Sequence, residues 1–449
     1  MKEKPGPQIV EPLKTPKYLI VVGGPTASGK TRLAIELAKH FDTVILSADS
    51  RQFYREMRIG NARPEEAELA EVPHFFLADR SVNQPLTAGA YAREALVRLE
   101  AVYQERDYAV LVGGSGLFIQ ALTSGFDTFP VVSPAIRQQV DELYTQTGLT
   151  GLQAELAVLD PDYYAQVDRQ NPARLKRALE VCYAGEQPYS AYRQKAVADH
   201  RFIPVFLQPS WTRAELYQRI DQRVERMVAA GLEEEVRSLA PLLDKPVLQT
   251  VGYQEWAAFF AGNQNLDETI KLIQQNSRRY AKRQLTWNRR EGHWKQVPRG
   301  AIKSALAYLH VVTREMLHLG KVADTGSLTD SVFFFPQEKI NQVGLFQLVD
   351  QQLVGRIQAI TTRDWAALLT WDLANLSTLG QSVLLHESLN RTESTRVYAK
   401  LAEEAEKAFF LSQGFQPVSY QHLPRKLQQV WQNSPPALLL EWNLAQQRF

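Results

Sequence analysis

Short apolar runs alternate with helical patterns over the first 130 residues of the chain. The continuous runs are Tyr18–Val22, Thr43–Ser47 and Tyr108–Val112, and Lys30–His40 has the apolar spacing of an amphipathic helix. Continuous apolar strands that alternate with helices are typical of a parallel sheet covered on both faces. The pattern therefore predicts an α/β fold at the start of the chain.

The pattern changes after residue 130 and returns near residue 200. Residues 131–199 are mostly helical in pattern, whereas Phe202–Leu207 is again a strand-like run. Long helical patterns follow over Arg213–Leu239 and Leu266–Trp287. This order predicts a helical insertion between two strands of one sheet.

Beyond about residue 310 the chain changes character again. The runs Val332–Phe335, Val383–Leu385 and Ala437–Leu440 predict strands, and Arg396–Phe410 predicts an amphipathic helix. This helix and the segment Gly414–Val418 after it faintly resemble the end of an N-acetyltransferase domain. The acetyl-CoA pyrophosphate loop of that fold is not visible in the sequence, so a structural or docking module is the favoured interpretation.

These changes of pattern divide the chain into domains. Residues 1–17 contain four prolines and predict a flexible tail. A boundary is expected near residues 305–325, around Gly320 and Gly326. The remaining segments are a sheet-containing core (18–130 and 200–310), a helical insertion (131–199) and a C-terminal α+β domain of unknown role (320–449).

Composition adds a few exclusions. The 449 residues are 45% hydrophobic and 22% charged, as in ordinary globular proteins, which excludes wholesale disorder. Cys182 is the one cysteine, so an internal disulfide framework and a multi-cysteine zinc site are excluded, and a reducing, cytoplasmic location is expected. The apolar runs are too short to span a bilayer, and the N-terminal segment has no signal-peptide pattern.

Charge is informative only locally. The formal net charge is +2, but the window Lys271–Gly300 holds nine lysines and arginines against one acid, Glu291. A local cluster of this kind predicts an anionic partner better than the total does.

One motif predicts a phosphate site. Gly24–Thr31 (GPTASGKT) fits the pattern G-x-x-x-x-G-K-[ST] between a predicted strand and a predicted helix. Glycines let such a loop wrap closely around an anion, the helix N-terminus favours negative charge, and the hydroxyl of the last residue can ligate Mg²⁺. The fold predicted is thus a P-loop NTPase-like parallel sheet flanked by helices. The predicted diphosphate-binding residues are Gly24, Pro25, Thr26, Ala27, Ser28, Gly29, Lys30 and Thr31.

Two further polar residues follow predicted strands. Asp49 ends the strand Thr43–Ser47, and carboxyl ends of parallel strands face the ligand crevice, so it can act as a general base or a metal-shell ligand. Capping of a helix N-terminus is the alternative for Asp49. Ser115 lies in a glycine-rich turn after Tyr108–Val112, where it can contact an anion. That strand carries no acid at its end, unlike an ordinary P-loop NTPase.

At this point the chain resembles the tRNA dimethylallyltransferases. The resemblance rests on seven segments in the family's order and covers about residues 18–300. They are Gly24–Thr31 (GPTASGKT), Ser47–Tyr54 (SADSRQFY), Arg58–Pro64 (RIGNARP), Val112–Ala121 (VGGSGLFIQA), Arg177–Val181 (RALEV), Val251–Tyr253 (VGY) and Tyr280–Trp287 (YAKRQLTW).

The resemblance implies a reaction. A dimethylallyl group passes from dimethylallyl diphosphate to N6 of the adenosine 3′-adjacent to the tRNA anticodon, and diphosphate is released. The phosphate loop then binds this diphosphate instead of ATP, with Lys30 and Mg²⁺ neutralising the leaving group and Thr31 at the metal. Catalytic roles are implied for Asp49 as the base, Lys30, Ser115 where the family usually has threonine, and Arg223, with Arg219 as the second choice.

The resemblance also implies tRNA contacts, including contacts by the helical insertion. The modified base must leave its stem-loop stack to reach the pocket. The basic window around Lys282–Arg289 agrees independently with such a role. The implied residues are Asp49, Ser50, Arg51, Gln52, Ser115, Arg137, Ala173, Arg174, Leu175, Lys176, Arg177, Gln249, Gly252, Tyr253, Lys282, Arg283, Gln284, Trp287 and Arg289.

Several alternatives remain open. Departures from the family pattern, such as Phe75 in place of a frequent second histidine and Asn288 in place of Phe or Leu, leave tRNA preference and pocket detail undecided. The rival functions are an adenylate isopentenyltransferase acting on free nucleotide, a P-loop small-molecule kinase and a non-catalytic tRNA-binding module. A monomer without membrane association is expected.

Overall fold

The computed structural model describes most of the chain. The described residues are 16–125, 127, 129–193, 202–290, 294–321, 339–347, 353–361, 366–373, 376–391, 396–401, 404–413, 415–418, 420–424, 427–428, 431 and 438–443. The expected flexible tail, apart from its last two residues, and the predicted strand Val332–Phe335 therefore lie outside the described residues. The chain forms two compact units, residues 86–98 with 117–201 and the remainder, and each is described by itself.

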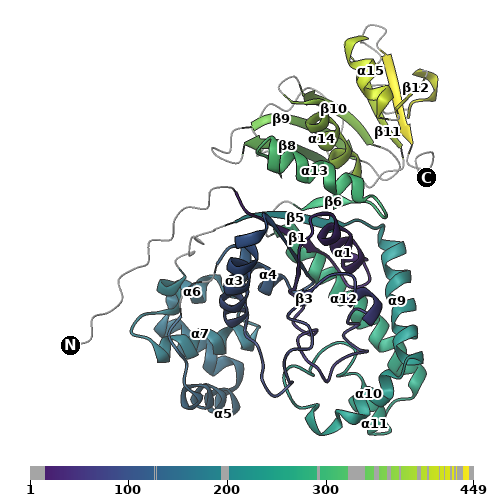
Figure 1. The fold of residues 1–449 in the computed structure, drawn as a ribbon. Helices are drawn as coiled ribbons and strands as arrows, with labels where there is room; N and C mark the ends of the chain where they lie inside the picture. Colours follow the sequence, from purple (N-terminus) through teal and green to yellow (C-terminus); the bar gives the residue numbers. More distant parts are fainter. Residues whose placement is uncertain are drawn as a thin grey trace. The chain divides into compact units, whose positions relative to one another are not determined.

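The larger unit is built on a six-stranded parallel sheet (Figure 1). Its strand order is β3-β2-β4-β1-β5-β6, and every pairing is parallel. The central strand β1 is buried along its whole length, which explains its uninterrupted apolar sequence. The α/β prediction is confirmed. The strands are β1 (Tyr18–Gly23), β2 (Ile45–Ser47), β3 (His74–Phe75), β4 (Tyr108–Gly113), β5 (Ile203–Pro209) and β6 (Lys295–Val297).

Most helices of this unit agree with the apolar spacing, with one correction. The single helix expected over Arg213–Leu239 is two helices, because Gly231 between them adopts a left-handed backbone with φ 96°. Thr212 begins the first of them through a capping box with Glu215. The helices are α1 (Lys30–His40), α2 (Glu66–Leu69), α9 (Arg213–Ala229), α10 (Leu232–Ser238), α11 (Trp256–Phe260), α12 (Leu266–Arg290) and α13 (Ile302–Arg314), with the 3₁₀ turn η1 (Ala240–Leu242).

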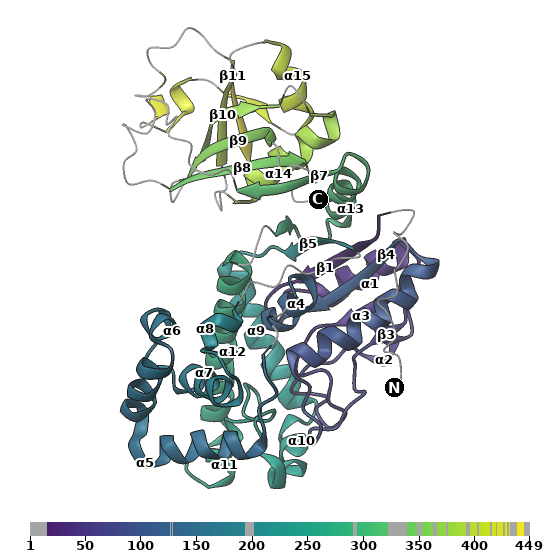
Figure 2. The same cartoon turned by 90° about the vertical axis from the view of Figure 1, so that its left-hand side faces the viewer.

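The smaller unit is helical, as the sequence pattern predicts for residues 131–199 (Figure 2). Its core includes Val140 and Leu152 of α5 with Leu175 and Leu179 of α7. The long helix α5 is kinked at Gly148, where φ is 65°. Its helices are α4 (Gly116–Thr123), α5 (Pro134–Leu159), α6 (Pro161–Gln166), α7 (Pro172–Ala184), α8 (Tyr189–Tyr192) and the first part of α3 (Ala88–Glu105).

The C-terminal residues form a second sheet of seven strands, in the order β12-β13-β11-β10-β9-β8-β7. Its strand pairs are antiparallel except β10 with β11, which are parallel. The elements are β7 (Leu317–Lys321), β8 (Lys339–Gln347), β9 (Leu353–Thr361), β10 (Ala366–Asp372), α14 (Thr378–Arg391), β11 (Arg396–Leu401), α15 (Glu404–Ser412), β12 (Gln416–Pro417), the 3₁₀ turn η3 (Tyr420–His422) and β13 (Leu438–Asn443).

Two sequence predictions fail in this region. Val383–Leu385 is not a strand but part of α14, where all three side chains are buried. A short apolar run cannot distinguish a buried helical segment from a buried strand. The helix expected over Arg396–Phe410 is a strand, β11, followed by the helix α15. The strand at Ala437–Leu440 is confirmed as β13.

Within the larger unit, the two sheets share one apolar core. Buried residues of α1 and β1 belong to the same cluster as Tyr308 and Leu309 of α13 and Leu384 of α14. One buried ion pair also joins them: Lys295 Nζ of β6 lies 3.1 Å from Glu387 Oε2 of α14, with 1% and 0% of the side chains exposed. The C-terminal sheet is therefore packed onto the parallel-sheet core.

Candidate functional site

The phosphate-loop motif lies between β1 and α1, as predicted. Ala27 and Gly29 have φ values of 61° and 83°, and Gly24 has φ 155°, so the loop turns back on itself. Gly29 precedes the first turn of α1, and no side chain caps that turn. A helix N-terminus without a side-chain cap leaves backbone amides available to an anion.

Bonds from outside the loop hold its carbonyl groups. Arg219 Nε donates to the Ala27 carbonyl at 2.8 Å, and Trp211 Nε1 donates to the Ser28 carbonyl at 2.7 Å. The Arg219 guanidinium also stacks 4.3 Å from the centre of the Trp211 ring. Ser28 Oγ is buried and has no hydrogen-bond partner within the described part of the chain. An unpartnered buried hydroxyl in a phosphate loop is suited to bind a phosphate oxygen or a metal-bound water.

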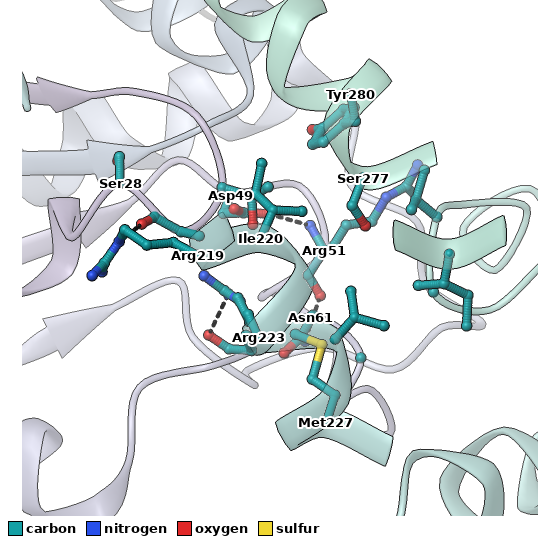
Figure 3. Close-up of a pocket in the computed structure, with 18 of the residues that line it drawn as sticks. Ser28, Asp49, Arg51, Asn61, Arg219, Ile220, Arg223, Met227, Ser277 and Tyr280 are labelled. Carbon is teal, nitrogen blue, oxygen red and sulfur yellow. Dashed lines mark hydrogen bonds between the residues drawn. The ribbon is translucent and has the colours of Figure 1, made fainter. Parts of the chain in front are cut away.

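A cavity of about 220 Å³ opens beside the loop (Figure 3). Asp49 lies between the arginines of α9 and Tyr280 of α12. Helix α9 presents Arg219, Arg223 and Arg226 to the cavity, because residues four and three apart share one face of a helix. Arg223 and Arg219 are the two arginines expected here from the sequence, and Arg226, one turn beyond Arg223, is a third that the same spacing identifies.

The electrostatics of this cavity favour an anion. Burial lowers the pKa of Lys30 to about 8, Asp49 opposes this shift, and Arg223 adds to it. Burial likewise lowers the pKa of Arg223 to about 10, although Asp49 raises it. Several cations crowded at one partly buried site carry uncompensated positive charge, which a diphosphate would neutralise.

Asp49 follows β2 and lines the cavity. Its Oδ1 accepts a hydrogen bond from Arg51 N at 3.2 Å, and its carbonyl accepts one from Gln52 N at 3.0 Å. These bonds form a turn, and the segment 48–53 contains no helix. The helix-capping interpretation of Asp49 is therefore wrong, and its carboxylate faces the cavity.

Ser115 is buried at the end of β4 and holds the turn that carries Asp49. Its Oγ accepts a bond from Ser50 N and donates one to Ser50 Oγ, both at 2.9 Å. Burial, and to a smaller extent the nearby Asp49, raises the pKa of the Tyr280 hydroxyl to about 12. A Cβ on Gly113 would clash with the Ala48 carbonyl, so this turn after β4 packs against the turn after β2. Within the described residues, the Ser115 hydroxyl thus holds the turn that carries Asp49 through Ser50.

A partly buried carboxylate, not expected from the sequence, supports the part of the cavity lined by Gly60, Asn61 and Ala62. Glu235 of α10 accepts hydrogen bonds from the backbone amides of Arg58, Ile59 and Gly60 at 2.7–3.0 Å. The Tyr253 hydroxyl donates to the same carboxylate at 2.7 Å. This arrangement fixes the segment 58–62, whose Ala62 carbonyl accepts bonds from Gln52 and Arg223. No local motif marks Glu235, because its partners lie far away in sequence.

The residues expected to contact tRNA divide by exposure. Leu175 and Tyr253 are fully buried, Leu175 in an apolar cluster and Tyr253 against Glu235, so their side chains leave no surface for tRNA. Gln284 is also buried, and its amide is bonded within the chain. Five of the expected residues line the cavity, namely Asp49, Arg51, Gln52, Gly252 and Gln284. The exposed members are Gln249, Lys282, Arg283 and Arg289 in the larger unit and Arg137, Ala173, Arg174 and Arg177 in the smaller one.

Membrane-spanning helices and clusters of metal-ligating side chains were both sought among the described residues. None of their helices is both long and apolar enough to cross a membrane. No group of three or more His, Cys, Asp or Glu side chains gathers there as a ready-made metal cage.

The parallel sheet with its phosphate-loop motif defines a P-loop-like α/β fold, and Arg219, Arg223 and Arg226 line the cavity beside that loop. A family model described as IPP transferase matches residues 52–291, more than half of the chain. The chain belongs to the IPP transferase family, whose curated relatives are tRNA dimethylallyltransferases. The C-terminal sheet lies outside the residues that the family model matches.

Individual relatives support this assignment. The tRNA dimethylallyltransferase of Christiangramia forsetii is 43% identical over 274 residues, 61% of this chain and 91% of the relative. That of Cytophaga hutchinsonii is 40% identical over 299 residues, 67% of this chain and 98% of the relative. A eukaryotic dimethylallyltransferase solved in the act of modifying tRNA has the same fold, with a TM-score of 0.59 at 19% identity over 75% of this chain and 91% of that chain.

Proposed function

We propose that this protein transfers a dimethylallyl group from dimethylallyl diphosphate to N6 of the adenosine 3′-adjacent to the anticodon of a tRNA, with release of diphosphate. Dimethylallyl transfer to tRNA is the activity for which the relatives are named. The supporting observation is that Asp49, Lys30 and Arg223 line one cavity. One catalytic base and two diphosphate-binding cations are what this reaction needs.

The diphosphate is the leaving group in this reaction. As the C1–O bond breaks, its electron pair moves onto the diphosphate, whose negative charge rises. The loop residues 24–31, Lys30 and the arginines of α9 stabilise that charge, and they do so most strongly in the transition state. The β4 strand ends in Gly113-Gly114-Ser115 without an acid, which agrees with a loop that binds a leaving group and activates no water.

The acceptor is an exocyclic amine and a weak nucleophile. Its lone pair forms the new N6–C1 bond, and the proton that N6 loses passes to the Asp49 carboxylate. Ser115 positions this base indirectly, because it holds Ser50 next to Asp49. The catalytic role that the family resemblance implies for Ser115 stays a prediction beside this indirect one.

The dimethylallyl tail requires an apolar surface that excludes water. Four apolar side chains of α9 and α12 line the same cavity, namely Ile220, Val224, Met227 and Ile273. Three of these are almost fully buried, and Met227 is only partly so. We therefore assign this wall to the prenyl tail, with the partly exposed and flexible Met227 at its outer end.

A divalent cation, Mg²⁺, suits the same site. The hydroxyls of Ser28 and Thr31 and the Asp49 carboxylate are oxygen donors of the kind it prefers, and diphosphate oxygens would supply the remainder. When bound, the ion neutralises charge on the diphosphate.

The anticodon arm of tRNA is the macromolecular partner. The exposed basic side chains of α12 (Lys282, Arg283 and Arg289) supply phosphate contacts in the larger unit. Such contacts provide affinity and register, whereas base choice depends on the cavity.

The test is incubation with dimethylallyl diphosphate and Mg²⁺, together with either unmodified tRNA or AMP, followed by mass analysis of nucleosides. Prenylated adenosine in tRNA is expected. Modified AMP without modified tRNA would instead identify an enzyme of free nucleotides. No product in either arm, together with tRNA binding, would identify a non-catalytic tRNA-binding module.

A further inference from the structure

Helix α12 has two polar faces with different environments. Lys282, Arg283 and Arg289 are exposed, whereas Gln284 and Asn288, one turn apart, are buried. Buried amides on a helix cost free energy unless their polar atoms are bonded. Both amides are bonded within the chain. The inner face of α12 therefore makes specific hydrogen bonds to neighbouring segments of the chain.

Gln284 connects the two loops that bound the cavity. Its Oε1 accepts a hydrogen bond from the backbone N of Thr26 in the phosphate loop at 3.0 Å. Its Nε2 donates to the carbonyl of Gly114, in the turn that follows β4, at 2.8 Å. Thr26 and Gln284 both line the cavity, so this contact lies at the site itself.

The glycines of the β4 turn agree with this contact. A Cβ on Gly114 would clash with Gln284 Nε2, and a Cβ on Gly116 would clash with the Trp287 ring. The turn therefore approaches α12 too closely for side chains. Glycine here allows the Gln284 amide to reach the phosphate loop.

We propose that Gln284 is a positioning residue for the diphosphate site and not a tRNA contact. It orients the phosphate loop through Thr26 and ties that loop to the turn that carries Ser115. The inference rests on the proposed function, because the loop is taken to bind the diphosphate of dimethylallyl diphosphate. Because both polar ends of the Gln284 amide are bonded within the chain, its loss should weaken the binding of dimethylallyl diphosphate and leave the binding of tRNA unchanged.

The main variant is Gln284→Met, which keeps the length of the side chain and removes both hydrogen bonds. Its matched control is Thr286→Ala on the same helix, whose hydroxyl bonds the Lys282 carbonyl of its own helix. Calorimetry measures the affinity for dimethylallyl diphosphate, gel shift measures the affinity for tRNA, and steady-state assays give KM for each substrate. Thermal unfolding shows whether each variant is folded.

The expected result for Gln284→Met is an affinity for dimethylallyl diphosphate weaker by about tenfold or more, with a tRNA affinity within about twofold of the wild type. Thr286→Ala should change neither. Gly114→Ala should reproduce the pattern, because it displaces the Gln284 amide without altering it. Gln284→Asn, too short to reach both partners, gives the same test if Gln284→Met does not fold.

The opposite pattern would overturn the inference. A variant with weaker tRNA binding and unchanged diphosphate affinity would show that Gln284 contacts tRNA. Equal losses for both substrates together with a lower unfolding temperature would show general structural damage. Failure of the wild-type protein to prenylate tRNA would count against the proposed function, whereas an active wild type with an unchanged Gln284→Met variant would overturn this inference alone.

Discussion

Two lysines illustrate the difference between the catalytic end of the parallel sheet and its junction with the C-terminal sheet. Lys295 is 1% exposed and pairs with the Glu387 carboxylate at 3.1 Å. Lys30 lines the cavity, and its Nζ contacts a backbone carbonyl, that of Pro25, at 3.4 Å. Among the described residues no carboxylate forms an ion pair with Lys30, although Asp49 lies near enough to raise its pKa.

The comparison distinguishes charges that the chain neutralises from charges that it keeps for a ligand. A buried ion pair that is complete contributes little net stability, but a buried charge that loses its partner is costly. At a functional site the protein instead tolerates an unneutralised charge, whose free-energy cost is recovered when substrate binds. Variants of the two lysines should therefore have opposite effects on stability and activity.

The largest expected effect is that of Lys295→Met on stability. The change removes the lysine ammonium from the buried Glu387 carboxylate, which keeps its bond from Gln296 N, at a cost of about 3–5 kcal/mol in the free energy of unfolding. Urea denaturation measures it. Lys39→Met is the matched control, because Lys39 is half exposed and its pair with Glu71 should contribute less than about 1 kcal/mol. Equal losses of unfolding free energy in the two variants would show that the buried pair is no more important for stability than the exposed one.

Lys30→Met should lower activity and leave the stability of the protein unharmed. Removal of a cation that stabilises the leaving group should lower turnover about 10²–10³-fold. The unfolding temperature of the ligand-free protein should stay constant or rise, because no carboxylate loses a partner. Single-turnover assays with dimethylallyl diphosphate and tRNA, together with thermal unfolding, measure both effects. A marked loss of stability would mean that the chain itself neutralises Lys30.

Asp49→Ala removes the proposed base from the same cavity. Turnover should fall about 10²–10³-fold, since general-base catalysis contributes effects of that size. tRNA binding in a gel shift should persist, because the arginines and lysines on the surface are unchanged. A variant that loses tRNA binding together with turnover would contradict the role of Asp49 as a base.

The sequence predicted the catalytic end better than the junction, for a physical reason. Lys30 and Asp49 follow apolar strands in short motifs, so local sequence is enough to place them at the carboxyl edge of a parallel sheet. Glu235 and the Lys295–Glu387 pair depend on partners far away in sequence, which no local pattern reveals. Val383–Leu385 shows the same limit, because burial alone does not distinguish a helix from a strand.

The buried face of α12 could in principle have been predicted from the sequence. The spacing of Ala281, Gln284 and Asn288 places them on one side of the helix, turned away from the side that carries exposed Lys282 and Arg289. The local charge cluster suggested that the whole segment contacts nucleic acid. The structure separates the two faces, and it thereby assigns Gln284 to the interior.

The smallest expected effect is on the pH dependence of substrate binding. Because the pKa of Lys30 is about 8, its ammonium is mostly charged at pH 7 and mostly neutral at pH 9. Dimethylallyl diphosphate favours the charged form, so binding takes up a proton above pH 8, and affinity should fall by up to about tenfold per pH unit there. Arg223, with a pKa of about 10, stays charged over this range.

Lys30→Arg separates this effect from other titrations, because a guanidinium stays charged at pH 9. Calorimetry between pH 7 and pH 9.5 should show a steep decline in affinity for the wild type and a flat profile for Lys30→Arg, whatever the absolute affinity of the variant. Parallel declines would assign the titration to another group. A flat wild-type profile would mean that Lys30 keeps the ordinary pKa of a solvated lysine, which would remove the contrast with Lys295 from which the comparison began.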